Sequence, residues 1–292
     1  MKTFKNIVVA TDFSDNSKSA YHYAQQMATR FSAALKVVYF FELPVSPTYS
    51  SYLDLMPNLS DLEAAADERL SRFVSESDTE SGDTVVVSRV KTTYKAQPGF
   101  GSDGLIELSQ DASVDLMILG ASGEHGWADK LFGSVAVRVS REAYCPVLLI
   151  PHGATFKGIH HMVYTSNFDS AQSKQIRLAL DFAKYFMSAI HFVHVITDSE
   201  DSGMTEEILF KYLIDGEQTK VPFTIENVHA AIPSEGIHNY LSENPTDLLV
   251  TVTHHRSFWE KFMHVSTSKA LAWNIETPLL VLHHNEISQP PA

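Results

Sequence analysis

Short apolar segments alternate with longer stretches of mixed character along the whole chain. The apolar segments lie near residues 6–11, 35–41, 84–90, 115–120 and 146–150, and again near 160–165, 189–196, 222–229, 247–252 and 278–282. They lack a strict alternation of apolar and polar positions, which indicates strands that are covered on both faces. Helices are predicted between them, in the first half near residues 17–33, 58–77, 103–112 and 134–143. This order is typical of an α/β fold with parallel sheets.

The pattern occurs twice. Three pairs of segments match: Asn6–Phe40 with His160–Val195, Val114–Leu119 with Thr246–Thr251, and Cys145–Ile150 with Thr277–Leu282. Because the repeat length is about half the chain, we interpret it as two copies of one domain rather than as a solenoid. The turn-rich stretch Pro151–Ala154 marks the boundary. We therefore place the two domains at residues 1–151 and 156–285.

Composition narrows the class of function. Of the 292 residues, 44% are hydrophobic and 20% are charged, which is ordinary for a globular protein. The net charge is −13 and no basic run is longer than a pair, so we expect no binding to nucleic acid. No apolar run is long enough to cross a bilayer, and the N-terminus lacks the apolar core of a signal peptide. With one cysteine, Cys145, no internal disulfide framework exists, and we expect a cytoplasmic protein.

The strongest candidate for chemistry is the loop after the fourth strand of the first copy. Open parallel sheets bind ligands beyond the carboxyl ends of their strands, where the strand order reverses. Here Gly120 and Gly123 precede a helix that is expected to start at Gly133-Ser134, a Gly-x2-Gly-x9-Gly-Ser spacing. Glycines let the backbone approach an anion, and a helix start presents free N–H groups. The spacing therefore predicts a phosphate-binding loop.

With this loop, the opening Val8–Ser14 and the closing Cys145–Pro151, the chain resembles tandem universal stress proteins of the UspA type. Their ATP-binding subgroup carries the same glycine spacing. The resemblance implies two doubly wound, Rossmann-like five-stranded domains of strand order 3-2-1-4-5. It also implies an internal pseudo-dimer in which the strands near 146–150 and 278–282 meet. ATP is the implied ligand, for a role in stress response or signalling, and slow hydrolysis is the most that is implied. Mg²⁺ is the expected companion, because polyphosphate charge needs neutralising.

The resemblance also implies which residues of the first copy bind the nucleotide. Thr11 and Asp12 would lie beside the adenosine, and the backbone of Phe40 would hydrogen-bond to adenine. The complete implied set is Ala10, Thr11, Asp12, Phe40, Leu119, Gly120, Gly123, Gly133, Ser134 and Val135. From the residues alone, Asp12 could instead be a turn residue, and Ser134 could serve as a helix cap as well as a phosphate donor.

The second copy departs from the glycine pattern. Gly120 aligns with Val252, Gly123 with His255 and Gly133 with Val265, and only Ser266 keeps its residue type. Side chains at the former glycines close the space for contact between backbone and phosphate. We therefore expect ATP in the first copy only.

Two further patterns leave alternatives open. His194 and His254 are expected at strand ends of the second copy, where they could form a metal site or sense a small molecule. Gly99–Gly104 matches the dinucleotide pattern G-x-G-x-x-G, but it follows the third strand rather than the first, so we interpret it as a turn that begins a helix. An interaction scaffold that uses no nucleotide, a homodimer and an unidentified protein partner also stay open.

Overall fold

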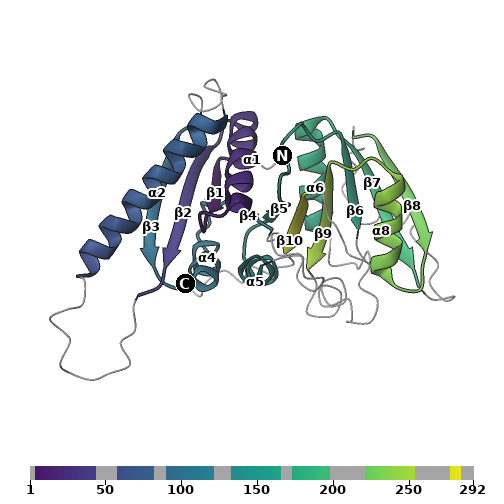
Figure 1. The fold of residues 1–292 in the computed structure, drawn as a ribbon. Coiled ribbons are helices and arrows are strands. Elements are labelled where there is room, and N and C mark those ends of the chain that lie inside the picture. Colours follow the sequence, from purple (N-terminus) through teal and green to yellow (C-terminus); the bar gives the residue numbers. More distant parts are fainter. Residues whose placement is uncertain are drawn as a thin grey trace, which may run out of the picture.

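The computed structural model of the protein describes residues 4–43, 58–81, 90–121, 133–165, 173–197, 221–253 and 277–283. The first half of the chain alternates strands with helices, as Figure 1 shows. Its elements are β1 (Asn6–Ala10), α1 (Asp15–Phe31), β2 (Ala34–Phe41), α2 (Leu59–Ser81), β3 (Thr92–Pro98), α4 (Gly101–Leu108), β4 (Leu116–Gly120), α5 (Ser134–Glu142) and β5 (Val147–Ile150).

The second half repeats this order. Its elements are β6 (His161–Thr165), α6 (Ser173–Phe186), β7 (Ala189–Ile196), β8 (Phe223–His229), α8 (Pro233–Glu243), β9 (Leu248–Thr253) and β10 (Leu279–His283). The strands of both halves form one ten-stranded sheet of order β3-β2-β1-β4-β5-β10-β9-β6-β7-β8. Each half thus has the predicted order 3-2-1-4-5. None of the described helices combines the length and apolar character that a bilayer crossing requires.

The two halves join through their last strands. β5 and β10 pair antiparallel, with Leu149 opposite Leu279 and Val147 opposite Val281. The other described strand pairs are parallel. The internal pseudo-dimer and the meeting of the two terminal strands are therefore confirmed.

The prediction for the third strand was wrong. We expected it near residues 84–90, of which 84–89 lie outside the described residues, but β3 runs from Thr92 to Pro98. The run at residues 84–90, with four valines, is more hydrophobic than β3 itself. Among the described strands, β3 pairs only with β2 at the edge of the sheet, and of its residues only Ala96 is buried. An edge strand needs few apolar side chains, so hydrophobicity is a poor guide to its position.

Two hydrophobic clusters cover the two faces of the sheet. Successive strand residues point to opposite faces, so Ile7 and Val9 belong to one cluster and Val8 to the other. The first cluster contains residues of α1, α2 and α6, and the second contains residues of α4, α5 and α8. We call these sides the α1 face and the α5 face. Helices on both faces explain why the strands show no simple alternation.

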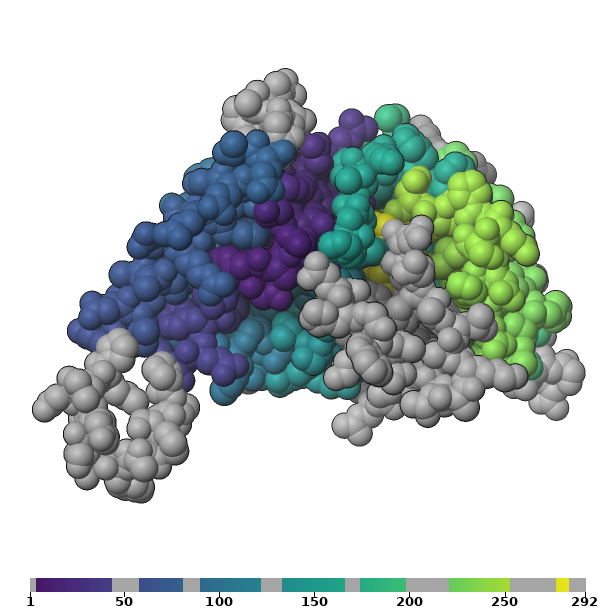
Figure 2. All heavy atoms as spheres, in the orientation of Figure 1, coloured from purple at the N-terminus to yellow at the C-terminus, as the bar shows by residue number. Residues whose placement is uncertain are grey.

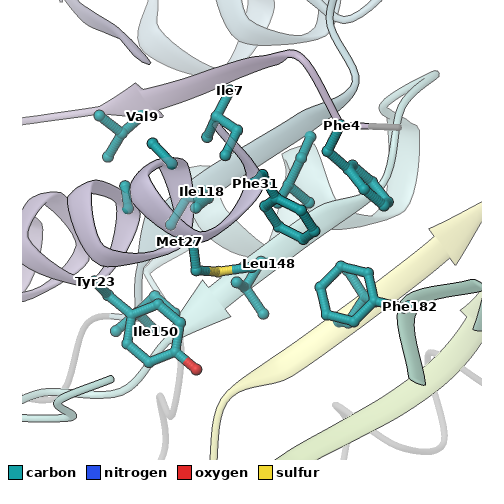
Figure 3. Close-up of a cluster of buried hydrophobic side chains, with 14 of the residues drawn as sticks. Phe4, Ile7, Val9, Tyr23, Met27, Phe31, Ile118, Leu148, Ile150 and Phe182 are labelled. Atoms are coloured by element: carbon teal, nitrogen blue, oxygen red, sulfur yellow. The ribbon is translucent and has the colours of Figure 1, made fainter. Parts of the chain in front are cut away.

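Aromatic side chains connect the halves on the α1 face. The ring of Phe182 lies 5.3 Å from that of Phe4 and 5.7 Å from that of Phe31, measured between centroids (Figure 3). The Tyr185 hydroxyl donates a hydrogen bond of 2.7 Å to the carbonyl oxygen of Arg30. Phe156, in the segment between the halves, packs its ring 5.1 Å from that of Tyr23. Figure 2 shows teal atoms of this region between the purple first half and the green second half. The repeats therefore share one core.

Candidate functional site

The strand order of the first half reverses between β1 and β4. The chain leaves β1 for α1 on one face of the sheet and leaves β4 for α5 on the other face. Crossovers that diverge in this way open a crevice at the carboxyl ends of the two strands. Ala10 ends β1 and Gly120 ends β4. The predicted residues at the ends of these two strands thus lie beside this crevice.

Three apolar residues line the α5 face at this edge. Ala10, Phe40 and Leu119 stand at the ends of the neighbouring strands β1, β2 and β4, and all three pack with the cluster on that face. Leu119 is buried, whereas Ala10 and Phe40 are half-buried. We call these three residues the platform. Its apolar surface suits the flat face of a ring, such as a nucleobase.

The backbone of Phe40 has hydrogen-bonding groups on the crevice side. β1 pairs with β2 only as far as Ala10 opposite Val38, and the N–H of Thr11 donates to the carbonyl of Val38 at 3.0 Å. Backbone groups alternate in direction along a strand, and the carbonyl of Phe41 accepts from Gly99 on the other side. The N–H and C=O of Phe40 therefore point toward the β1 side, beyond the last residue of that strand.

Thr11 and Asp12 shape the turn after β1. The Thr11 hydroxyl lies 2.9 Å from that of Ser17 and accepts a 2.9 Å hydrogen bond from the N–H of Phe13. Asp12 Oδ1 accepts from the N–H of Ser14 at 3.0 Å and from its hydroxyl at 2.6 Å. Burial raises the pKa of Asp12, but the hydrogen bonds from Ser14 outweigh it and hold that pKa below its ordinary value. Asp12 is thus both a turn residue and an exposed carboxylate at the crevice.

Helix α5 begins beside the platform, and none of the described side chains caps its start. Gly133 occupies the N-cap position with φ −60° and ψ 151°, and no described side chain accepts a hydrogen bond from the N–H groups there. Ser134 is the first helical residue, so the capping role that the sequence left open for it is not seen. Ser134 and Val135 are exposed. The uncapped N–H groups and the positive end of the helix dipole can bind an anion. Gly123 lies outside the described residues.

Gly120 has a structural role that the sequence did not reveal. A Cβ at this position would lie 2.7 Å from the carbonyl oxygen of Asn16 and 3.0 Å from the backbone nitrogen of Ser17. The first turn of α1 therefore packs directly on the end of β4. A glycine is needed here for packing, whether or not a phosphate approaches it.

The second half differs at the platform positions. Its matching strands place Thr165 where Ala10 stands, Val195 where Phe40 stands and Thr251 where Leu119 stands. Thr251 is fully buried, and its hydroxyl makes no hydrogen bond within the part of the chain that the structure describes. Polar groups thus replace an apolar surface. This difference is independent of the lost glycines.

The metal-site alternative involves His194 and His254. His194 is buried on β7, between two residues of the α5-face cluster, so its side chain points to the α1 face. His254 lies outside the described residues. Among the described residues, no group of three or more His, Cys, Asp or Glu side chains is placed to hold a metal ion.

The chain matches a known family over both halves. The model of the universal stress protein family matches residues 3–151 and again residues 160–283. A relative from Staphylococcus haemolyticus that carries the family's name is 31% identical over 153 residues, which is 51% of this chain and 86% of the relative. A universal stress protein from Methanocaldococcus jannaschii is 29% identical over 50% of this chain and 82% of its own length.

Solved structures agree on the fold. A universal stress protein from Archaeoglobus fulgidus aligns over 97% of this chain and 98% of its own, with a TM-score of 0.68 and 16% identity. Another solved universal stress protein is described as a complex with cAMP, but it covers 52% of this chain and all of its own with a TM-score of 0.38 and 21% identity, which is too low to bear on the ligand of this chain. From the two family matches and this fold, we conclude that the chain belongs to the universal stress protein family and contains two copies of its domain.

Proposed function

We propose that this protein binds ATP in the crevice of its first half, as part of a stress-response or signalling function. The observation that carries the proposal is that the apolar platform and the uncapped start of α5 lie together on one face, while the second half has polar residues at two of the three platform positions. The base would rest on Ala10, Phe40 and Leu119. The phosphates would reach the N–H groups of Ser134 and Val135.

Each part of the nucleotide has a suitable neighbour. The backbone N–H and C=O of Phe40 can pair with the edge of adenine. Asp12 is charged, because its pKa lies below the ordinary value, and it can accept hydrogen bonds from the ribose or the base. Mg²⁺ would neutralise the phosphates and bind through their oxygens. Turnover would be far below an ordinary enzyme rate of about 10 s⁻¹.

Calorimetric titration with ATP and Mg²⁺ tests the proposal. We expect one site per chain in the wild type and loss of that site in Gly123→Val, because the added side chain blocks the phosphate loop. His255→Val is the matched control, since His255 aligns with Gly123 in the second half. It should bind like the wild type. Equal binding by Gly123→Val, or loss of binding in His255→Val, would contradict the assignment to the first half.

The same titration separates the alternatives. A scaffold that uses no nucleotide predicts no binding of ATP by the wild type. Titration with cAMP under the same conditions shows whether the triphosphate is recognised. Because we assign the phosphates to the start of α5, we expect cAMP to bind more weakly than ATP.

A further inference from the structure

The side chain of Phe40 lies directly on the backbone of Gly104. A Cβ added to Gly104 would lie 2.1 Å from Cε1 of the Phe40 ring, 2.5 Å from Cδ1 and 2.6 Å from Cζ. Such distances are far below van der Waals contact, so only glycine at position 104 allows the ring this position. Gly104 is the last glycine of the G-x-G-x-x-G match, and it stands in α4 rather than in a phosphate-binding turn.

The second half has the same contact with a smaller side chain. Gly236 is the fourth residue of α8, as Gly104 is the fourth of α4. A Cβ at Gly236 would lie 2.7 Å from Cγ1 of Val195, the residue that matches Phe40. The glycine therefore serves strand–helix packing in both halves. Only in the first half does its partner belong to the platform.

Helix α4 is also tied to the helix on the phosphate side. The Arg138 guanidinium of α5 donates to the Ser102 hydroxyl at 2.9 Å and to Asp103 Oδ1 at 2.6 Å. Its Nε donates to Glu142 within α5 at 3.3 Å. The exposed ion pair between Arg138 and Asp103 adds little stability, but it links α5 to α4. α4 therefore contacts the base side of the crevice through Gly104 and the phosphate side through Ser102 and Asp103.

We propose that Gly104 is a positioning residue for the nucleotide base. Its missing side chain lets the Phe40 ring pack on α4, and this contact holds the platform and the end of β2 in the position that binds the base. The proposal rests on the proposed function. A methyl group at position 104 drives the ring away from α4. Because Phe40 is only half-buried, its ring can move toward the crevice and solvent without unfolding the protein. The displaced ring then occupies space that the base would need.

The test compares Gly104→Ala with its matched control Gly236→Ala by ATP titration. We expect Gly104→Ala to bind ATP about tenfold more weakly, a loss typical of a displaced contact residue. Gly236→Ala introduces a milder clash, 2.7 Å from Val195 Cγ1, at the matching position of the second half and should keep the wild-type affinity. An equal loss in both variants, or no loss in Gly104→Ala, would overturn the assignment.

A double-mutant cycle with Phe40→Ala separates positioning from general damage. Without the ring, a methyl group at position 104 has no clash with it, so we expect Gly104→Ala to cause no further loss of ATP affinity in the Phe40→Ala background. The same loss in both backgrounds would mean that Gly104 acts by another route, and the inference would be wrong. This background also provides a readout if Gly104→Ala alone fails to fold. A wild type that binds no ATP would remove the proposed function and this inference with it, whereas a wild type that binds ATP with an unaffected Gly104→Ala would remove the inference alone.

Discussion

The imidazole Nε2 of His283, at the end of β10, lies 2.8 Å from the carbonyl oxygen of Ser140 in α5. A carbonyl can only accept, so Nε2 carries the proton and donates. The last turn of a helix leaves carbonyl groups without partners, and this imidazole satisfies one of them. The second half of the chain thus holds the helix whose other end forms the phosphate side of the proposed site.

This contact predicts a dependence of stability on pH. Burial lowers the pKa of His283 from 6.5 to about 4, although hydrogen bonds to the backbone of Ser140 and Cys145 act in the opposite direction. Between those two values the unfolded chain takes up a proton that the folded chain does not. The free energy of unfolding should therefore fall as the pH falls through this window, by up to about 3 kcal/mol, and the imidazole should have no such effect at higher pH.

His283→Gln isolates this contribution, because its amide can still donate to Ser140 but does not titrate. Urea unfolding of both proteins at several pH values gives the comparison, in which the other histidines cancel. We expect the wild type to lose more stability than the variant on acidification. Parallel curves for the two proteins would show that His283 is not neutral in the fold.

Substitution at Gly120 should destabilise the protein even without nucleotide. An alanine Cβ there would press on the backbone of Asn16, and backbone cannot move aside as a flexible side chain can. We expect Gly120→Ala to lower the free energy of unfolding by about 1–3 kcal/mol. Gly101→Ala is the control, since its Cβ would lie 4.0 Å from Val135 Cγ1, which is ordinary contact. Chemical denaturation measures both, and similar values for the two would contradict the packing argument.

Two aspartates occupy equivalent positions at the amino ends of the strands, opposite the proposed site. Asp115 Oδ2 accepts from the N–H groups of Lys5 and Asn6 at 2.9 and 3.1 Å. Asp247 Oδ2 accepts from those of His160 and His161 at 2.7 and 2.9 Å. Asp115 thus connects the start of β1 to the start of β4, and Asp247 connects the start of β6 to the start of β9.

We expect Asp115→Ala and Asp247→Ala each to cost about 1–2 kcal/mol of unfolding free energy. Because the two sites share no partner, the double variant should lose the sum of the two within about 0.5 kcal/mol. Equilibrium denaturation of the three variants tests this. A double variant no worse than either single one would speak against two independent anchors.

The buried hydroxyl of Thr251 predicts a stabilising substitution. It lacks a hydrogen bond within the described residues, and a buried polar group without a partner is costly. Thr251→Val keeps the shape and removes the hydroxyl, so it should raise the free energy of unfolding by about 1 kcal/mol. Placing the second half's residue at the matching position of the first half, Leu119→Thr, should lower the free energy of unfolding. A less stable Thr251→Val would indicate that the hydroxyl has a partner in solution.

The sequence was a good guide wherever a local pattern carried the information. Each half repeats buried strands, and apolar runs such as Val147–Ile150 and Leu279–His283 stand close to their predicted places. The G-x-G-x-x-G match was correctly interpreted as a turn that begins a helix: Gly99 has φ +140° and α4 starts at Gly101. The strand order and the meeting of β5 with β10 came from the family resemblance, because local patterns do not encode which strands pair.

What the sequence missed depends on contacts between distant segments. β3 carries few apolar residues because only one of its edges is paired, so its position could not be found from hydrophobicity. The packing of Gly120 on Asn16 and of Phe40 on Gly104 joins separate elements of the fold. One signal could have revealed the second contact: Gly104 and Gly236 fall at the same position of the two copies, although the glycines of the phosphate loop do not.

The central claim is that nucleotide binds in the first half and not in the second. Native mass spectrometry of the intact chain with ATP and Mg²⁺ tests it most directly, because it counts the nucleotides on each chain. We predict one ATP per chain in the wild type and in His255→Val, and none in Gly123→Val. Two nucleotides per chain, or one that remains in Gly123→Val, would contradict the account.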